Sequence, residues 1–315
     1  MTGAPDVVVI GEVLIEISAD EPFRSAQLVR FGISGDALNS AAAAAASGAR
    51  TALVTRVGDD DLGRAIIARL TELDVDTSWI RQVPGQQGVY FDLADPSGSR
   101  QFSYARRGSA ASTMTPADLA DLPVPRVVLA SGITGAISAS AADTIRAAAS
   151  LGQAFVYDPN FRPRLTSAVT AAALLAELAP LAAVVTPSAP GESNALLGEK
   201  DPAAAAAAVR RLGAAAVAVT CGVDGILVDA GNDQRLVPAI PAPSVVDQTG
   251  AGDVFAGTMA GRLALGDPLQ DAVALAAAAA SLSIGGQGGA GLIPTLAQTR
   301  SHLAAHLAWT RDEAS

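Results

Sequence analysis

The chain has 315 residues, of which 50% are hydrophobic and 17% charged, with 21 basic and 31 acidic side chains. This length and apolar content predict a folded protein with a large core, and they exclude a disordered chain or a small disulfide scaffold. The formal net charge of -10 provides no basic surface for a phosphate backbone, so no nucleic-acid partner is expected.

The single cysteine and the start of the chain predict a cytoplasmic protein. Cys221 has no partner for an internal disulfide, and the sequence contains no Cys/His cluster with metal-ligand spacing. The first residues lack the basic stretch of a signal peptide, and the apolar run 272–284 is shorter than the ~18 residues that a membrane-spanning helix needs. We therefore expect no membrane contact and a buried helix at 272–284.

Short β-branched runs alternate with alanine-rich segments along the chain, which predicts the α/β class with a mainly parallel sheet covered on both faces. Asp201-Pro202 indicates a helix start, and residues 115–118 form a capping box. No repeat or long linker divides the chain, so one domain is expected over 1–315. The predicted strands are 7–10, 52–55, 127–129, 155–157, 184–186 and 217–220.

One region alternates apolar and polar residues instead. Residues 88–106, with a turn at 95–98, predict a hairpin that carries Tyr90 and Tyr104. These tyrosines either pack the hairpin or face a ligand. Together with an N-terminal segment, the hairpin predicts a small antiparallel sheet, a lid formed by about 12–34 and 86–108. Its exposed edges favour a homodimer through the lid.

The stretch 247–257 carries the clearest chemistry. Gly250, Ala251 and Gly252 place small residues at the start of a helix that runs to about residue 266, where unpaired amides and the helix dipole favour an anion. Asp253 in the first turn is predicted as a general base that accepts the proton of a hydroxyl attacking a phosphoryl group. The alternative is an ordinary loop-to-helix junction with a favourable first-turn charge.

Residues 247–253, Asp-Gln-Thr-Gly-Ala-Gly-Asp, closely resemble the C-terminal signature of the ribokinase-like PfkB family of carbohydrate kinases. Residues 35–39 resemble the family's N-terminal sugar-binding signature. The resemblance covers nearly the whole chain. It implies a Rossmann-like three-layer sandwich with a β lid, ATP and Mg²⁺ as cosubstrates, and a monovalent cation as a further candidate cofactor. Asp253 then matches the catalytic base, and Gly250, Ala251 and Gly252 match the anion hole.

The resemblance also implies a nucleotide side of the site and a metal-organising residue. Glu192 matches a family glutamate that organises magnesium through water, while Cys221 is expected to be inert. The residues expected on the nucleotide side are Asn160, Arg162, Thr220, Gly222, Gly225, Gly250 and Gly252.

Within the family, the lid segments and residues 11–18 resemble those of 2-keto-3-deoxygluconate kinases. Several arginines also suggest a substrate carboxylate, which a guanidinium binds bidentately; alternatively, they bind ATP phosphates or solvent. The open alternatives are a kinase for a neutral sugar, fructose or ribose, and a catalytically silent sugar-binding regulator. The residues expected around the acid sugar are Gly35, Asp36, Asn39, Tyr90, Tyr104, Arg106, Arg162 and Asp253.

The sequence departs from the family pattern at three places. Ala189 stands where an asparagine precedes Glu192, which puts the metal affinity in doubt. Ile33-Ser34 are expected to lengthen the loop that meets the sugar, and Gln248 replaces a common threonine with a mild effect. Elsewhere, His302 and His306 are interpreted as a solvated helix face rather than a metal site.

Overall fold

The β-branched runs form the centre of the molecule. The computed structural model describes residues 3–94, 100–231 and 233–313. Its main-sheet strands are β1 (Val7–Ile10), β4 (Thr51–Gly58), β5 (Val75–Asp76), β6 (Ile80–Val83), β9 (Val127–Ser131), β10 (Ala154–Asp158), β11 (Val184–Val185), β12 (Val217–Thr220), β13 (Ile226–Asp229) and β14 (Gln234–Val237). They pair in the order β14-β13-β12-β11-β10-β9-β1-β4-β5, with β6 beside β4. All pairs from β5 to β12 are parallel, while β13 and β14 add an antiparallel edge, so the predicted α/β class is confirmed.

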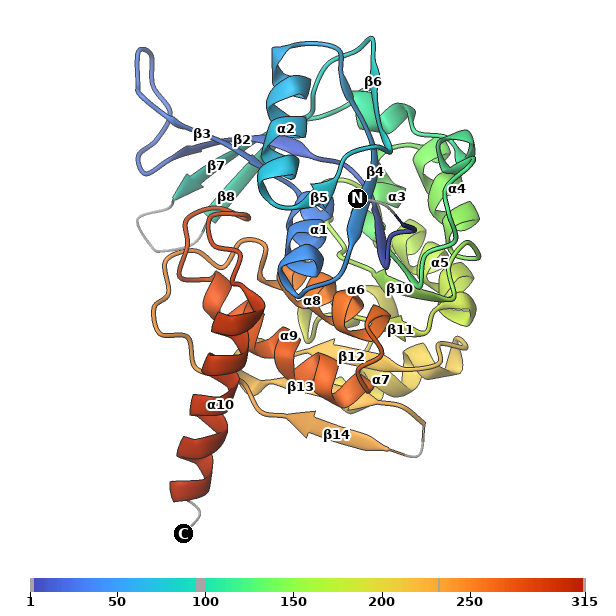
Figure 1. Ribbon diagram of the computed structural model, residues 1–315, viewed down its shortest axis with the longest axis vertical. Helices are drawn as coiled ribbons and strands as arrows, with labels where there is room; N and C mark the ends of the chain where they lie inside the picture. Colours follow the sequence, from blue (N-terminus) through green and yellow to red (C-terminus); the bar gives the residue numbers. More distant parts are fainter. Residues whose placement is uncertain (1–2, 95–99, 232, 314–315) are drawn as a thin grey trace.

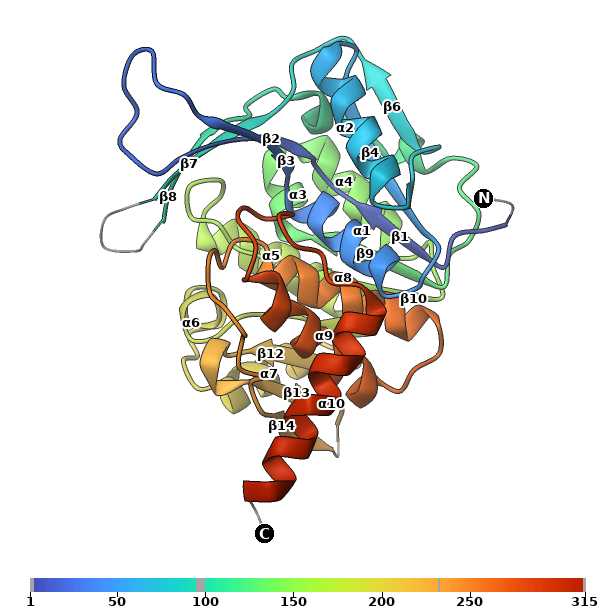
Figure 2. The same ribbon diagram turned by 60° about the vertical axis from the view of Figure 1, so that its left-hand side comes forward.

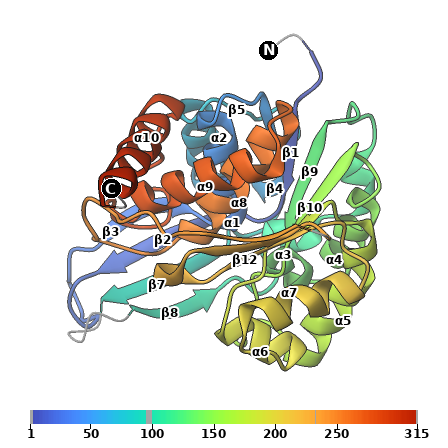
Figure 3. The same cartoon turned by 90° about the horizontal axis from the view of Figure 1, so that it is seen from below.

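Helices cover both faces of this sheet, giving three layers (Figure 1 and Figure 3). One face carries α1 (Asp36–Ala46), α2 (Asp61–Glu72), α8 (Ala251–Ala264), α9 (Leu269–Ser283) and α10 (Leu296–Glu313). The other carries α3 (Gly132–Ile137), α4 (Ala139–Ala148), α5 (Ala168–Leu178), α6 (Gly191–Leu197) and α7 (Pro202–Arg211). In β1, Val7 and Val9 join one core cluster and Val8 and Ile10 the other. Successive strand residues point to opposite faces, so a continuous apolar run is needed here.

The helix signals are confirmed, with one difference in type. The Asp201 carboxylate accepts the Ala204 N–H at 2.9 Å and caps α7. The capping box of Thr115 and Asp118 is present, but it begins only a short 3₁₀ helix, η2 (Pro116–Leu119). Asp121, with φ of 63°, turns the chain away directly afterwards. Further 3₁₀ turns are η1 (Ala110–Thr113), η3 (Ala179–Leu181) and η4 (Gly222–Asp224).

Within the described part of the chain, every helix is too short or too polar to cross a membrane.

A second, four-stranded sheet projects from the body (Figure 1 and Figure 2). It contains β2 (Leu14–Ala19), β3 (Arg30–Ser34), β7 (Val89–Ala94) and β8 (Arg100–Ala105), in the order β3-β2-β7-β8. The antiparallel β7–β8 hairpin is confirmed, although its predicted turn at 95–98 lies outside the described residues. The predicted small antiparallel sheet is present, with the difference that β2 pairs with β7 in parallel. The intervening chain crosses the main sheet through β4, α2, β5 and β6 and returns to the lid in the same direction.

Helix α8 is held in place by close packing against α1 along its middle and later turns. A Cβ on Gly257 would overlap the Ser40 carbonyl, and one on Gly261 would overlap the Ser47 hydroxyl. The two helices therefore approach each other through backbone rather than side chains. This approach places residues 39 and 40 of α1 beside Asp253 of α8.

Gly257→Ala tests this packing. We expect the free energy of unfolding to fall by about 1–3 kcal/mol, because an inserted methyl group forces the two backbones apart. The midpoint of urea unfolding measures it. Gly191→Ala is the matched control, since a Cβ there meets no atom within 4 Å, and it should be as stable as the wild type or slightly more stable. Equal stability of both variants would contradict the close approach.

Candidate active site

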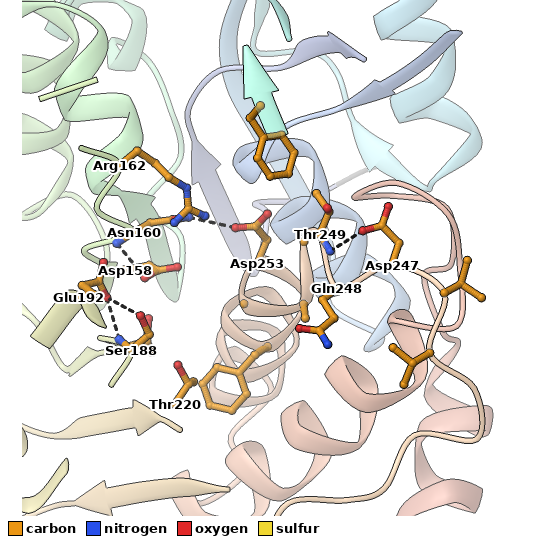
Figure 4. Close-up of a pocket in the computed structure, with 18 residues that line it drawn as sticks. Asp158, Asn160, Arg162, Ser188, Glu192, Thr220, Asp247, Gln248, Thr249 and Asp253 are labelled. Atoms are coloured by element: carbon orange, nitrogen blue, oxygen red, sulfur yellow. Dashed lines mark hydrogen bonds between the residues drawn. The ribbon is translucent and has the colours of Figure 1, made fainter. Parts of the chain in front are cut away.

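A cleft of about 540 Å³ lies where the carboxyl ends of β10, β11 and β12 face the start of α8 (Figure 4). This is where ligands bind in open α/β sheets. Phe102 of the lid also lines it, so the cleft extends from the body to the lid. The lining residues are Phe102, Asp158, Asn160, Arg162, Thr186, Ser188, Glu192, Thr220, Val245, Val246, Asp247, Gln248, Thr249, Gly250, Ala251, Gly252, Asp253 and Phe255.

The glycine-rich start of α8 forms an open N-terminus. Gly250 has φ of 82°, and a side chain there would overlap the backbone of Gly289. The Ala251 N–H donates to the Gln248 carbonyl at 3.3 Å, so this member of the predicted anion hole is already engaged. Among the described residues, the amides of Gly252 and Asp253 donate to no backbone carbonyl, and a Cβ on Gly252 would meet no atom within 4 Å. The helix therefore presents unpaired amides toward an unobstructed space.

Asp253 is held between two side-chain amides. Its Oδ2 accepts from Asn39 Nδ2 at 2.9 Å, and its Oδ1 accepts from Asn160 Nδ2 at 3.1 Å. Burial raises the pKa of Asp253 to about 6, with a further rise from Asp36. The Asn39 amide, Arg162 and the Asn160 amide act in the opposite direction. The group is thus a carboxylate at neutral pH whose pKa suits a proton acceptor.

The sugar-binding signature lies beside this carboxylate. The Ser34 hydroxyl donates to Asn39 Oδ1 at 3.2 Å, which orients the amide toward Asp253. Asp36 is buried, and neither of its carboxylate oxygens has a hydrogen-bond partner. Burial raises its pKa, while Arg106 acts in the opposite direction. A buried carboxylate without a hydrogen-bond donor costs free energy. Such a group is typical of a site where a ligand hydroxyl supplies the missing donor.

The predicted longer loop before this signature is wrong. Ile33 and Ser34 belong to β3, where they pair with Ile15 and Leu14 of β2. The extra residues extend the lid strand instead of forming a loop, because the β2 backbone offers them partners. Gly35, with φ of 124°, then turns the chain into α1. Its Cβ would overlap the Glu12 carbonyl, so the turn requires glycine.

The lid tyrosines and Arg106 form a polar cluster next to the cleft, in which Tyr90 and Arg106 are buried and Tyr104 is half-buried. The Tyr90 hydroxyl donates to Glu16, and the Arg106 guanidinium pairs with Glu12, whose other oxygen accepts from Ser109. Arg106 also lies 5.7 Å from the centre of the Tyr104 ring. The charge of Arg106 is therefore already balanced within the protein. The sequence reasoning missed Glu12 and Glu16, although acidic residues next to or inside buried strand positions were a detectable signal.

Glu192 connects the turn after β10 to the loop before α6 by hydrogen bonds. Its Oε1 accepts from the Phe161 N–H, and its Oε2 accepts from the Ser188 N–H at 2.7 Å. Burial raises the pKa of Glu192. The neighbouring Arg162 is exposed and lies at the cleft. In the described part of the chain, no group of three or more His, Cys, Asp or Glu side chains is arranged to hold a metal ion.

The expected nucleotide residues are only partly brought together. Thr220 lines the cleft, whereas Gly222 and Gly225 lie outside its lining. Gly225, with φ of 97°, is needed for close approach to the Val237 carbonyl of β14 rather than to the cleft. Burial raises the pKa of the Cys221 thiol, which favours its unreactive form.

Two further loops and a helix complete the surroundings. The Asp247 carboxylate accepts from the Thr249 N–H at 3.0 Å and from the Gly288 N–H at 2.8 Å. It therefore joins the loop before α8 to the glycine-rich loop 285–291.

On α10, His302 Nε2 lies 3.0 Å from the Ser281 hydroxyl, a contact that belongs to helix packing.

Comparison with known proteins gives a family for this arrangement. Residues 4–296 match the model of the pfkB family of carbohydrate kinases. A 2-dehydro-3-deoxygluconokinase from Thermoproteus tenax is 32% identical over 92% of this chain and 91% of its own. A PfkB protein from Polaromonas sp. JS666 superposes with a TM-score of 0.84 at 28% identity, over 95% of this chain and all of its own. A fructokinase from Vibrio cholerae O395, solved with fructose, ADP and calcium, gives 0.82 at 26% identity, over 94% and 98%.

Asp158→Asn tests how much the repulsion among the clustered carboxylates lowers the stability of the fold. Burial and the nearby Glu192 and Asp253 raise the pKa of Asp158 well above its usual value, so the folded state binds its proton more tightly than the unfolded state. This contribution to stability is present in acid and is lost as the pH rises through the folded pKa. Asparagine removes the charge and keeps an acceptor for the Asn160 N–H.

We therefore expect Asp158→Asn to raise the Tm by about 2–4 °C at pH 8 and to leave it nearly unchanged at pH 4, as measured by thermal melts. Asp74→Asn, at an exposed position outside the cleft, serves as the control and should change neither value. A lower Tm for Asp158→Asn at pH 8 would show that the charge itself stabilises the fold.

Proposed function

Because the chain belongs to the pfkB family of carbohydrate kinases, we propose that it transfers the γ-phosphoryl group of ATP to a sugar acid. The proposed substrate is 2-keto-3-deoxygluconate, and the product is its 6-phosphate. The observation that carries this proposal is the pair of asparagine amides that holds Asp253 at the open start of α8. This geometry supports a proton acceptor placed next to an anion site.

In this mechanism, Asp253 accepts the proton of the attacking hydroxyl as the oxygen bonds to phosphorus. The Gly252 and Asp253 amides donate to the phosphoryl oxygens and stabilise the charge that develops on them. Because these donors are fixed by the helix, little reorganisation is needed during the reaction. The lid sheet, which carries Phe102 into the cleft, excludes water that would otherwise hydrolyse ATP.

The cleft residues suit a nucleotide with its magnesium ion. Mg²⁺ keeps several waters and is typically held by substrate phosphates together with one or two carboxylates. Asp253, Asp158 and Glu192 line one wall of the cleft, and Glu192 already uses both oxygens for main-chain amides, which favours contact through water. When bound, the ion neutralises phosphate charge. Val245 and Val246, half-exposed members of the lining, suit a nucleobase.

The acid sugar is supported by the relative named 2-dehydro-3-deoxygluconokinase and by the arginines. Since Glu12 balances Arg106, we assign the substrate carboxylate to Arg162, the exposed arginine among the residues that line the cleft. Asp36 and Asn39 then face the sugar hydroxyls, and Tyr90, Tyr104 and Arg106 complete the wall under the lid.

A neutral sugar is the second candidate. It is supported by the similarity to a fructokinase and by the unpartnered Asp36 carboxylate, which suits hydroxyl groups without requiring a substrate charge. A silent regulator is disfavoured, because such a protein has no need of a base held by two amides.

Asp253→Asn tests the kinase assignment. We expect a fall in kcat of ~10²- to 10⁴-fold, the usual contribution of a general base, with ATP affinity retained in calorimetry. In the wild type, kcat/KM should fall as the pH drops below about 6, where Asp253 becomes protonated. Asp271→Asn, which alters the first-turn aspartate of α9, is the matched control and should retain full activity. Near-native turnover of Asp253→Asn would exclude the assigned role.

Arg162→Ala tests the class of sugar. We expect KM for 2-keto-3-deoxygluconate to rise at least about tenfold, because a hydrogen-bonded ion pair with the carboxylate is lost. KM for ATP should stay within about twofold. Steady-state kinetics over a panel of acid and neutral sugars measures both values, with Arg211→Ala on α7 as an exposed control. Neutral sugars turned over better than the acid by the wild type would favour the second candidate.

A further inference from the structure

The turn that follows β10 contains a strained asparagine. Asn160 is buried and has φ of 40°, in the left-handed region that side chains other than glycine rarely adopt. Asparagine tolerates this conformation best, at a cost of order 1 kcal/mol. Such strain persists only where the surroundings fix the backbone. The hydrogen bonds around this turn show what fixes it.

Two carboxylates from different elements hold consecutive amides of the turn. Asp158 Oδ1 accepts from the Asn160 N–H at 3.2 Å. Glu192 Oε1 accepts from the Phe161 N–H, and its Oε2 accepts from Ser188 on the loop before α6. The peptide groups on either side of Asn160 are thereby tied to β10 and to α6. From this fixed backbone the Asn160 side chain is directed toward Asp253 (Figure 4).

The geometry points to Asn160 as a positioning residue for Asp253, with Glu192 acting through it by fixing the turn. Asn160 Nδ2 donates to Asp253 Oδ1 at 3.1 Å, while Asn39 occupies Oδ2. Each oxygen of the base therefore has one amide donor, and both donors favour the charged form. This inference deepens the proposed function, on which it rests. It assigns Asn160 to the base rather than to the nucleotide, and Glu192 to the backbone rather than solely to the metal.

Other charges act on the same carboxylate and define what a pH measurement reports. Asp36 on α1 and Asp158 on β10 oppose its ionisation, whereas Arg162, two residues after Asn160, favours it. Asn160→Gly leaves all three in place, so a change in the acid limb of its pH profile reports the amide that was removed.

Asn160→Gly is the decisive variant. Glycine relieves the strain and keeps the backbone path, so folding is preserved, but the Nδ2 donor is lost. With 2-keto-3-deoxygluconate and ATP-Mg²⁺, we expect kcat to fall about tenfold or more and the acid limb of kcat/KM to move up by roughly one pH unit. KM for ATP should change less than twofold. Asp121→Gly, which relieves a comparable φ of 63° in an exposed loop, is the matched control and should leave all three values unchanged.

Glu192→Gln tests the second half of the inference. It keeps one acceptor but presents an NH₂ group to the other amide, which loosens the turn. We expect the acid limb to move in the same direction as in Asn160→Gly, and the double variant to show no more than the effect of Asn160→Gly alone. If Glu192 acted only through the metal, the Mg²⁺ concentration at half-maximal rate would rise while the acid limb stayed in place.

An unchanged acid limb in Asn160→Gly, with an ATP KM raised tenfold, would overturn the inference and return Asn160 to the nucleotide. The wild-type rate with the sugar acid separates this from failure of the proposed function. A wild type that turns over 2-keto-3-deoxygluconate with an unshifted Asn160→Gly profile refutes only the positioning role. If the wild type prefers a neutral sugar, the same profiles are measured with that sugar and decide the positioning role in the same way.

Discussion

The site depends on one constraint, which is that a half-buried carboxylate must remain charged at neutral pH. Burial and neighbouring acids oppose the ionisation of Asp253, and the protein offsets this with donors from two separate elements. Asn39 comes from α1 and Asn160 from the turn after β10. The two donors meet Asp253 only if α1, α8 and the end of β10 are placed correctly relative to one another. The backbone contact of α8 with α1 at Gly257 sets the first of these relations.

Local signals in the sequence were sufficient for six strands of the main sheet and for the start of α8, whereas β5, β6, β13 and β14 were not predicted. Continuous β-branched runs have few structural solutions, and small residues before an aspartate mark the start of a helix, while the prediction of an anion site there depended on the whole stretch 247–257. Long-range partners were not predictable in the same way. Asn39 and Asp253 are 214 positions apart, and Glu12 and Ser109 are 97 apart. Nothing in the local pattern around Ile33 shows that β2 extends far enough to pair with it.

The number of arginines in the sequence overstates the positive charge that is available to a substrate, for the same reason. Counting arginines near the lid treats each one as a free cation, but Glu12 balances the buried Arg106. A paired, desolvated guanidinium still offers hydrogen bonds, yet it contributes less net attraction for an anion. The exposed Arg162 is the arginine among the lining residues, and it lies among the carboxylates that line the cleft. A sugar acid would therefore meet its positive charge at Arg162.

Placing several carboxylates around one turn has an electrostatic cost, and the hydrogen bonds of Asp158 and Glu192 explain what these carboxylates contribute. Asp158 and Glu192 each accept at least one main-chain N–H, so a neutral acceptor would satisfy the same amides at a lower electrostatic cost. What a carboxylate adds is a second oxygen with its own lone pairs. Glu192 uses this to join the turn at Phe161 to the loop at Ser188. That connection spans the position at which Ala189 replaces the asparagine of the resembled family. Glu192 therefore holds the loop at Ser188 by itself, and the loop stays in place although Ala189 lacks the side chain of an asparagine.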